Sequence, residues 1–127
     1  MTPEALLLRQ VHPTFVTDGR PTSQAFIPFP IDEGGLSVYD GDHIDASVAY
    51  THYTQDLGNE SESTWAVTQS EATDHGVTPV SAPLPDFPSH ALIEFPLPEN
   101  KKGWRKIAKK LKISALERGV VYRPSGR

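Results

Sequence analysis

The stretch NKKGWRKIAKKLKISALERG, residues 100–119, is the most regular pattern of the chain. Its apolar residues recur at helical spacing on one face and are Trp104, Ile107, Ala108, Leu111 and Ala115. Such a stripe is typical of an amphipathic helix that packs one face against a core. Asn100 is a suitable N-cap, and Gly119 suits the position just after the last turn. We therefore expect a helix over residues 100–118.

The polar faces of this helix are almost wholly basic. All six lysines of the chain lie between Lys101 and Lys112, and residues 101–127 carry ten cations against one carboxylate. Residues 1–100 carry two cations against fifteen carboxylates. The formal net charge of −4 therefore combines an acidic body of −13 with a basic segment of +9. This asymmetry bears on electrostatic association and not on the fold.

Two segments before the basic helix have informative apolar patterns. Residues 5–11 fit either a buried strand or a short helix, because periodicity alone does not separate the two. Residues 45–57 predict a second helix, capped by an aspartate and closed by Gly58. The expected core stripe of this second helix consists of Val48, Ala49, Tyr53 and Leu57.

Short strands and turns are expected elsewhere in the chain. The predicted strands cover residues 22–29, 36–39, 65–68, 90–95 and 120–123. Ser70 and Glu71 predict one or two helical turns that end at Gly76. Strands and helices interleave without a strict βαβ rhythm, which favours the α+β class. We expect one domain, residues 1–127, with a small mixed or antiparallel sheet and two main helices, residues 45–57 and 100–118.

Several classes of protein lack their sequence signature here. The chain has no cysteine, so disulfides and thiolate metal sites are excluded. No apolar stretch approaches the roughly 20 residues that span a bilayer, and no basic flank precedes the short N-terminal apolar run. The histidines show no metal-ligand spacing, and the phosphate-binding and dinucleotide glycine motifs are missing. We expect a cytoplasmic protein with no membrane partner, no metal and no cofactor.

Four polar residues are candidates for a catalytic role: Arg9, Tyr39, His52 and Glu71. His52 precedes Asp56 by about one helical turn, so the two form either a polarised base or a surface pair. His12 and His90 each stand beside a proline-containing turn, where ring-to-backbone hydrogen bonds are expected. Ser37 is not part of the Gly-x-Ser-x-Gly elbow that exposes a nucleophilic serine.

The order of Arg9, Tyr39 and Glu71 along the chain resembles small NAD-consuming ADP-ribosyltransferase-like domains of the RES kind. The resemblance covers about residues 5–75. It implies that Arg9 holds the pyrophosphate, that Tyr39 stacks on nicotinamide and that Glu71 orients the ribose. The Gly-Arg-Trp-Asn type motif of that family is missing, because residues 19–22 are Gly-Arg-Pro-Thr. In the alternative interpretation, Glu71 caps a short helix and Arg9 pairs with a neighbouring aspartate.

The basic helix predicts an anionic partner or, alternatively, a solvated face that offsets the charge of the body. Its cations are Lys101, Lys102, Arg105, Lys106, Lys109, Lys110 and Lys112. We expect a non-enzymatic protein that binds a protein partner, as a small accessory subunit of a larger bacterial or phage-related assembly. The alternatives are the NAD-consuming enzyme, nucleic-acid binding through residues 101–112, and head-to-tail self-association. No aromatic residue is interleaved with the cations on the polar face, since Trp104 belongs to the core stripe, so base stacking lacks a platform.

Overall fold

The computed structural model describes residues 1–29 and 33–124 and contains a five-stranded antiparallel sheet. In spatial order, its strands are β5 (Ser63–Thr68), β1 (Leu6–Val11), β4 (Gly35–Asp40), β7 (His90–Glu94) and β6 (Thr78–Ser81). A small separate hairpin joins β2 (Val16–Thr17) to β3 (Arg20–Pro21). Every strand pair is antiparallel. The predicted α+β class is confirmed.

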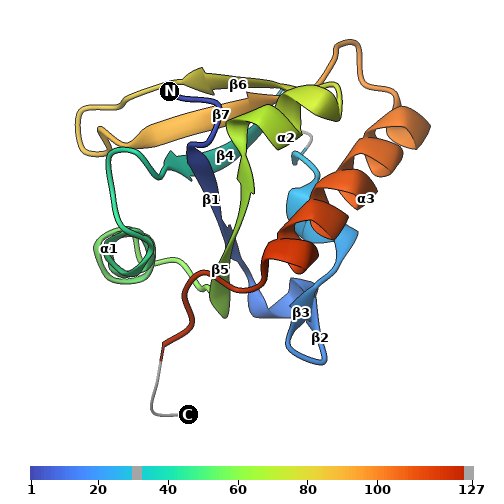
Figure 1. Ribbon diagram of the computed structural model, residues 1–127. Coiled ribbons are helices and arrows are strands. Elements are labelled where there is room, and N and C mark those ends of the chain that lie inside the picture. The colour runs from blue at the N-terminus through green and yellow to red at the C-terminus, as the bar shows by residue number, and fades with distance from the viewer. Residues whose placement is uncertain (30–32, 125–127) are drawn as a thin grey trace.

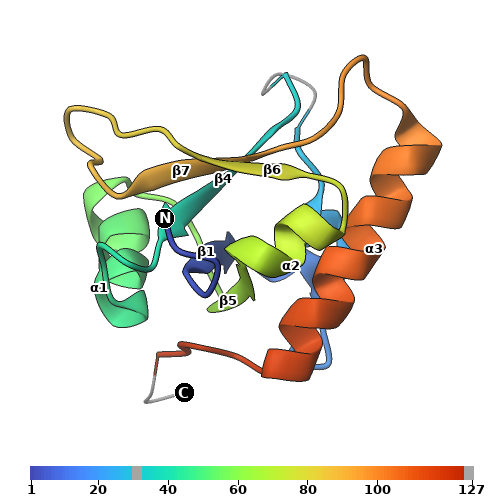
Figure 2. The same cartoon turned by 45° about the horizontal axis from the view of Figure 1, so that its top comes forward.

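Helices cover both faces of the sheet (Figures 1 and 2). They are α1 (Ala46–Thr51), which continues as a π turn (His52–Asp56), α2 (Gln69–Asp74) and α3 (Lys101–Arg118). The first helix lies on one side of the sheet, whereas α2 and α3 lie on the other. Both main helices that the sequence predicts are present.

The α3 helix closes the larger of two apolar cores. Its buried residues are Trp104, Ala108, Leu111 and Ala115, with Ile107 partly buried. They pack against the apolar face of the sheet, including Leu7 on β1 and Ile93 on β7. The Asn100 side chain accepts a hydrogen bond from the Gly103 amide at 3.0 Å, which caps the helix as predicted. Among the described residues, no helix combines the length and apolar character needed to cross a bilayer.

The second core, under α1, is small. It contains the buried residues Leu8, Tyr39, Ala49 and Ala66. The prediction that Val48 and Leu57 belong to the core stripe of this helix is wrong, because Val48 is 54% exposed and Leu57 is 42% exposed. A π turn has a longer repeat than an α turn, so the residues that follow it no longer keep the α-helical spacing. Leu57 therefore does not follow the face that buries Ala49.

Three further segments have mixed outcomes. For residues 5–11 the sequence left both a strand and a helix open, and the structure shows that they contain the strand β1. The strand predicted over residues 22–29 is wrong, because Ser23–Phe26 form a short 3-10 helix that buries Ala25 and Phe26 next to each other. Neighbouring side chains point to opposite faces of a strand, so their joint burial fits a helical turn better. The segment 120–123 contributes only an isolated bridge, between Tyr122 and Thr64.

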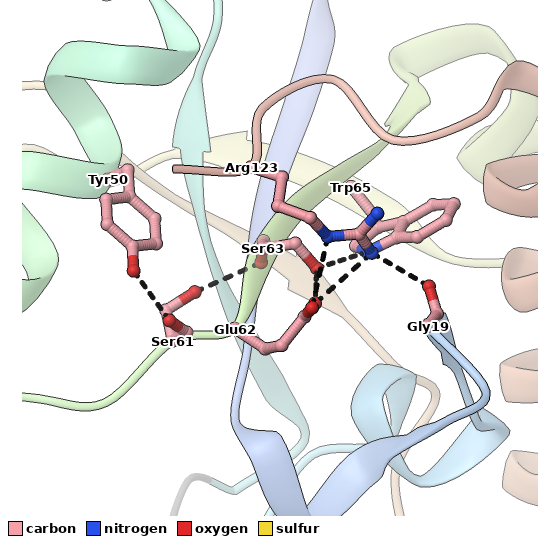
Figure 3. A network of polar contacts seen from close by, with 7 residues as sticks. All are labelled: Gly19, Tyr50, Ser61, Glu62, Ser63, Trp65 and Arg123. Carbon is pink, nitrogen blue, oxygen red and sulfur yellow. Dashed lines mark hydrogen bonds and ion pairs between the residues drawn. The ribbon is translucent and has the colours of Figure 1, made fainter. Parts of the chain in front are cut away.

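The chain after α3 is fixed by a polar network (Figure 3). Arg123 donates to the Glu62 carboxylate at 3.0 Å and to the Gly19 carbonyl at 2.8 Å. Trp65 donates from its indole to the Ser63 hydroxyl at 2.8 Å, and that hydroxyl donates in turn to Glu62. The network therefore ties the C-terminal segment to the turn of the β2–β3 hairpin and to the start of β5.

Candidate functional site

A pocket of about 340 Å³ opens where β1 and β4 stop pairing. The two strands pair only at Leu7–Asp40 and Leu8–Tyr39. The polar side chains that line the pocket include Arg9, Gln10, His12, Ser37, Tyr39 and Tyr53. Two of the predicted candidates, Arg9 and Tyr39, therefore meet at one site. Its volume falls at the lower end of the range that small-molecule sites occupy.

Arg9 bridges the gap between the separated strands. Its Nε donates to the Ala25 carbonyl at 2.8 Å, and its Nη1 donates to the Ser37 carbonyl at 2.9 Å. The guanidinium thus supplies a donor to a β4 carbonyl at the point where the β1–β4 ladder has ended. Because arginine stays protonated, these contacts fix a positive charge at the wall of the pocket.

Tyr39 also forms a hydroxyl–imidazole pair with His52, which does not line this pocket but a neighbouring one. The Tyr39 hydroxyl lies 2.7 Å from His52 Nδ1, and His52 Nε2 lies 3.2 Å from the Asp86 carbonyl oxygen. A carbonyl only accepts, so Nε2 carries the proton and Nδ1 accepts from Tyr39. Burial raises the pKa of Tyr39 far above its ordinary value, and its acidic neighbours Tyr53 and Asp56 raise it further, since a second negative charge beside them is unfavourable. Tyr39 therefore keeps its proton. Both ring nitrogens of His52 are used by Tyr39 and Asp86, so Asp56 is not a hydrogen-bond partner of this histidine.

Gln10 leaves one end of its side-chain amide without a protein partner. The residue is 5% exposed, and its Oε1 accepts from Ser61 and Thr64 at 2.9 and 2.8 Å. Its Nε2 has no hydrogen-bond partner among the described residues. Turning the amide over would leave Oε1 in that position instead. In either orientation, a residue that lines the pocket keeps one polar end for a ligand or water, since leaving it unpaired costs about 1–3 kcal/mol.

Glu71 is not among the residues that line this pocket. Its carboxylate accepts from the Thr68 amide at 2.8 Å, and Thr68 Oγ1 accepts from the Glu71 amide at 3.0 Å. These two bonds make the capping box of α2, so the expectation that Glu71 caps a short helix is confirmed. Arg118 of α3 also donates two bonds to Glu71, at 2.8 and 3.0 Å. The NAD-consuming interpretation requires Glu71 to lie beside Arg9 and Tyr39, whereas in the structure Glu71 pairs with Arg118 of α3.

Glu71→Gln is expected to lower stability at neutral pH more than in acid. The hydrogen bond from Arg118 lowers the pKa of Glu71 below its ordinary value, and Thr68 reinforces this shift against the opposing effect of burial. A carboxyl with a depressed pKa stabilises the fold above its unfolded pKa, and this contribution is lost as the pH falls through the folded pKa. We expect a loss of about 1 kcal/mol at pH 7 and a smaller loss at pH 3, measured by urea unfolding.

Glu117→Gln is the control for this prediction. Glu117 is exposed on α3, next to Arg118 in sequence, and forms no ion pair with any residue of the described part of the chain. Its replacement should change stability by less than about 0.5 kcal/mol at both pH values. Equal effects of the two substitutions would show that the Arg118 contact contributes nothing measurable.

The predicted cationic residues form one exposed surface on α3, which we call the lysine surface. Its exposed members are Lys101, Lys102, Arg105, Lys106, Lys109 and Lys110, and Lys112 is half-buried at its margin. Across residues 1–29 and 33–124, none of them forms an ion pair with a carboxylate. The carboxylates of Asp45 and Asp56 belong to the ends of the helical segment on the other side of the sheet (Figure 2). These two carboxylates and the lysine surface therefore lie on opposite sides of the sheet.

The ring-to-backbone hydrogen bonds predicted for His12 and His90 are confirmed. His12 Nδ1 accepts from the Thr14 amide at 3.1 Å, and His90 Nδ1 lies 2.8 Å from the Ala82 carbonyl oxygen.

Comparison of the chain with models of protein families, with curated proteins and with solved structures finds no match in any of the three. The site is therefore interpreted from its own geometry.

Proposed function

We propose that the protein binds the acidic surface of a protein partner through the lysine surface of α3. The observation that supports this most directly is that these cations are exposed and have no carboxylate partner among the described residues. A surface that only offset the charge of the body would gain from ion pairs with it. Cations held without such pairs remain available to an external anionic group, and they raise the rate of association at low salt.

A protein is favoured over a nucleic acid by two features of the surface. Six of its seven cations are lysines, which act as point charges and lack the flat, bidentate geometry of arginine. The one aromatic residue of α3, Trp104, is buried in the core and offers no stacking platform. The acidic body would also repel the long polyanion beyond the edge of the helix.

Reversing three neighbouring charges, as Lys106→Glu, Lys109→Glu and Lys110→Glu together, is expected to abolish the association. These residues stand at i, i+3 and i+4 and share one side of the helix. At low salt we expect affinity to fall by at least about 100-fold, since attraction is replaced by repulsion. The measurement is quantitative capture from nuclease-treated host extract at low and high salt. The retained protein should be lost with the variant and at high salt.

The matched control replaces the same three lysines by arginine, which keeps the charge and the helix. That variant should retain the partner, and both variants should melt within a few degrees of the original protein. Equal capture by the charge-reversed protein would refute the proposal. Retention that disappears on nuclease treatment would instead assign the surface to a nucleic acid. A mass that doubles at low salt without extract would identify a second copy of the chain as the partner.

A further inference from the structure

Ser37, which lines the pocket, forms a second hydroxyl–imidazole pair with His90. Ser37 Oγ lies 2.9 Å from His90 Nε2. In the antiparallel pairing of β4 with β7, Tyr39 is opposite His90. Ser37 is two residues before Tyr39, so it lies on the same face of the sheet, diagonal to His90. Ser37 is exposed and lines the pocket, whereas Tyr39 is 2% exposed.

The backbone fixes which nitrogen of His90 carries the proton. His90 Nδ1 lies 2.8 Å from the Ala82 carbonyl oxygen, which only accepts hydrogen bonds. Nδ1 is therefore protonated, and the lone pair of Nε2 faces the Ser37 hydroxyl. The serine proton is thus directed at a base that is itself oriented by a third group. This is the arrangement that activates serine nucleophiles, here with a carbonyl in place of the usual carboxylate.

Two features of the surroundings of Ser37 favour acyl transfer. The adjoining pocket includes the apolar side chains of Phe15, Phe29 and Phe87, which suit a small acyl or aryl group. Arg9 donates to the Ser37 carbonyl at 2.9 Å, so a positive charge is fixed beside this residue. Such a charge stabilises the negative charge that develops on a carbonyl oxygen under attack.

We propose that Ser37 is a nucleophile, activated by His90, that cleaves small activated esters. Ser37 Oγ bonds to the carbonyl carbon of the ester while its proton passes to His90 Nε2. The bond from that carbon to the leaving oxygen then breaks, and the departing alkoxide takes the proton from His90 and leaves as the alcohol. Water repeats the sequence on the acyl-serine, releases the carboxylic acid and restores the serine. This activity does not depend on the lysine surface of α3.

A second serine–histidine pair of this chain provides the internal control. His75 Nε2 lies 2.9 Å from Ser114 Oγ, on the side of the sheet that carries α2 and α3. The other ring nitrogen of His75 has no hydrogen-bond partner among the described residues, so nothing there fixes the tautomer. A serine–histidine distance alone would predict equal reactivity at Ser37 and Ser114. The proposal predicts reaction at Ser37 only.

The test is labelling of the folded protein with a fluorophosphonate, which forms a phosphonyl–serine bond with loss of fluoride. Peptide mass spectrometry should place the adduct on Ser37 at a rate at least about 10-fold above that on Ser114. The adduct should form in Ser114→Ala and be absent from Ser37→Ala. His90→Gln should slow labelling and the hydrolysis of p-nitrophenyl acetate by about 100-fold or more, the usual contribution of a general base.

Three results would each overturn the proposal: no adduct on Ser37, equal labelling of Ser37 and Ser114, or labelling of a folded His90→Gln variant at the original rate. Ser37 is exposed, so Ser37→Ala is expected to fold. The comparison of Ser37 with Ser114 needs no variant at all. It therefore decides the question even if His90→Gln does not fold.

Discussion

Leu111→Ala is expected to lower the free energy of unfolding by about 3–4 kcal/mol. Leu111 is fully buried on α3, within the core that joins this helix to the sheet. Removing most of its side chain leaves a cavity, because the surrounding strands and helix relax only in part. Domains of this size are stable by about 5–15 kcal/mol, so the loss is a large fraction of the total. Urea unfolding followed by circular dichroism measures it.

The large effect follows from how α3 is attached to the protein. The seven cations of the lysine surface make no ion pairs with the body among the described residues, so α3 is held chiefly by its apolar stripe and by the contact of Arg118 with Glu71. Ile113→Ala is the matched control, since Ile113 is 44% exposed on the same helix. It should cost less than about 1 kcal/mol. Equal costs at the two positions would contradict the assignment of Leu111 to the core.

The α3 helix was the element best determined by sequence alone. Its stripe, its cap at Asn100 and its end at Gly119 act locally, so each is visible without knowledge of the tertiary contacts. The strand of β1 was ambiguous from sequence because a short apolar run suits either state. The 3-10 helix of Ser23–Phe26 is not evident from sequence because Phe26 and its neighbours Thr22 and Ile27 favour strands, and burial of Phe26 in the core with α3 overrides that preference.

The pocket was harder to predict than the fold. Arg9 and Tyr39 were identified as candidates, and the structure brings them together, but Ser37 was set aside because it lacks a nucleophile elbow. Its partner His90 is 53 positions away in sequence. The two meet only through the register of β4 with β7, and strand register between distant segments is not encoded in local patterns. Gln10 gave no sequence signal, since its orphan amide end is a property of the packed core.

Gly41→Ala is expected to lower the free energy of unfolding by about 2–3 kcal/mol, through a steric collision. A β-carbon at this position would lie 2.6 Å from the Leu6 carbonyl oxygen and 3.1 Å from the Leu6 β-carbon. The neighbour cannot move away cheaply, because it is backbone and accepts a 2.7 Å hydrogen bond from the Gly41 amide. Relief of the collision must therefore separate the start of β1 from the end of β4. Urea unfolding at neutral pH measures the loss.

Gly58→Ala separates this collision from ordinary backbone strain. Gly58 has φ +70°, which L-residues rarely adopt, but a β-carbon there would meet nothing within 4 Å. We expect a cost of about 1 kcal/mol from conformation alone, clearly below that of Gly41→Ala. Equal costs would show that the β1–β4 junction yields without strain. If Gly41→Ala has the larger cost, the junction is rigid, and the pairs Leu7–Asp40 and Leu8–Tyr39 that follow it hold the pocket wall in register.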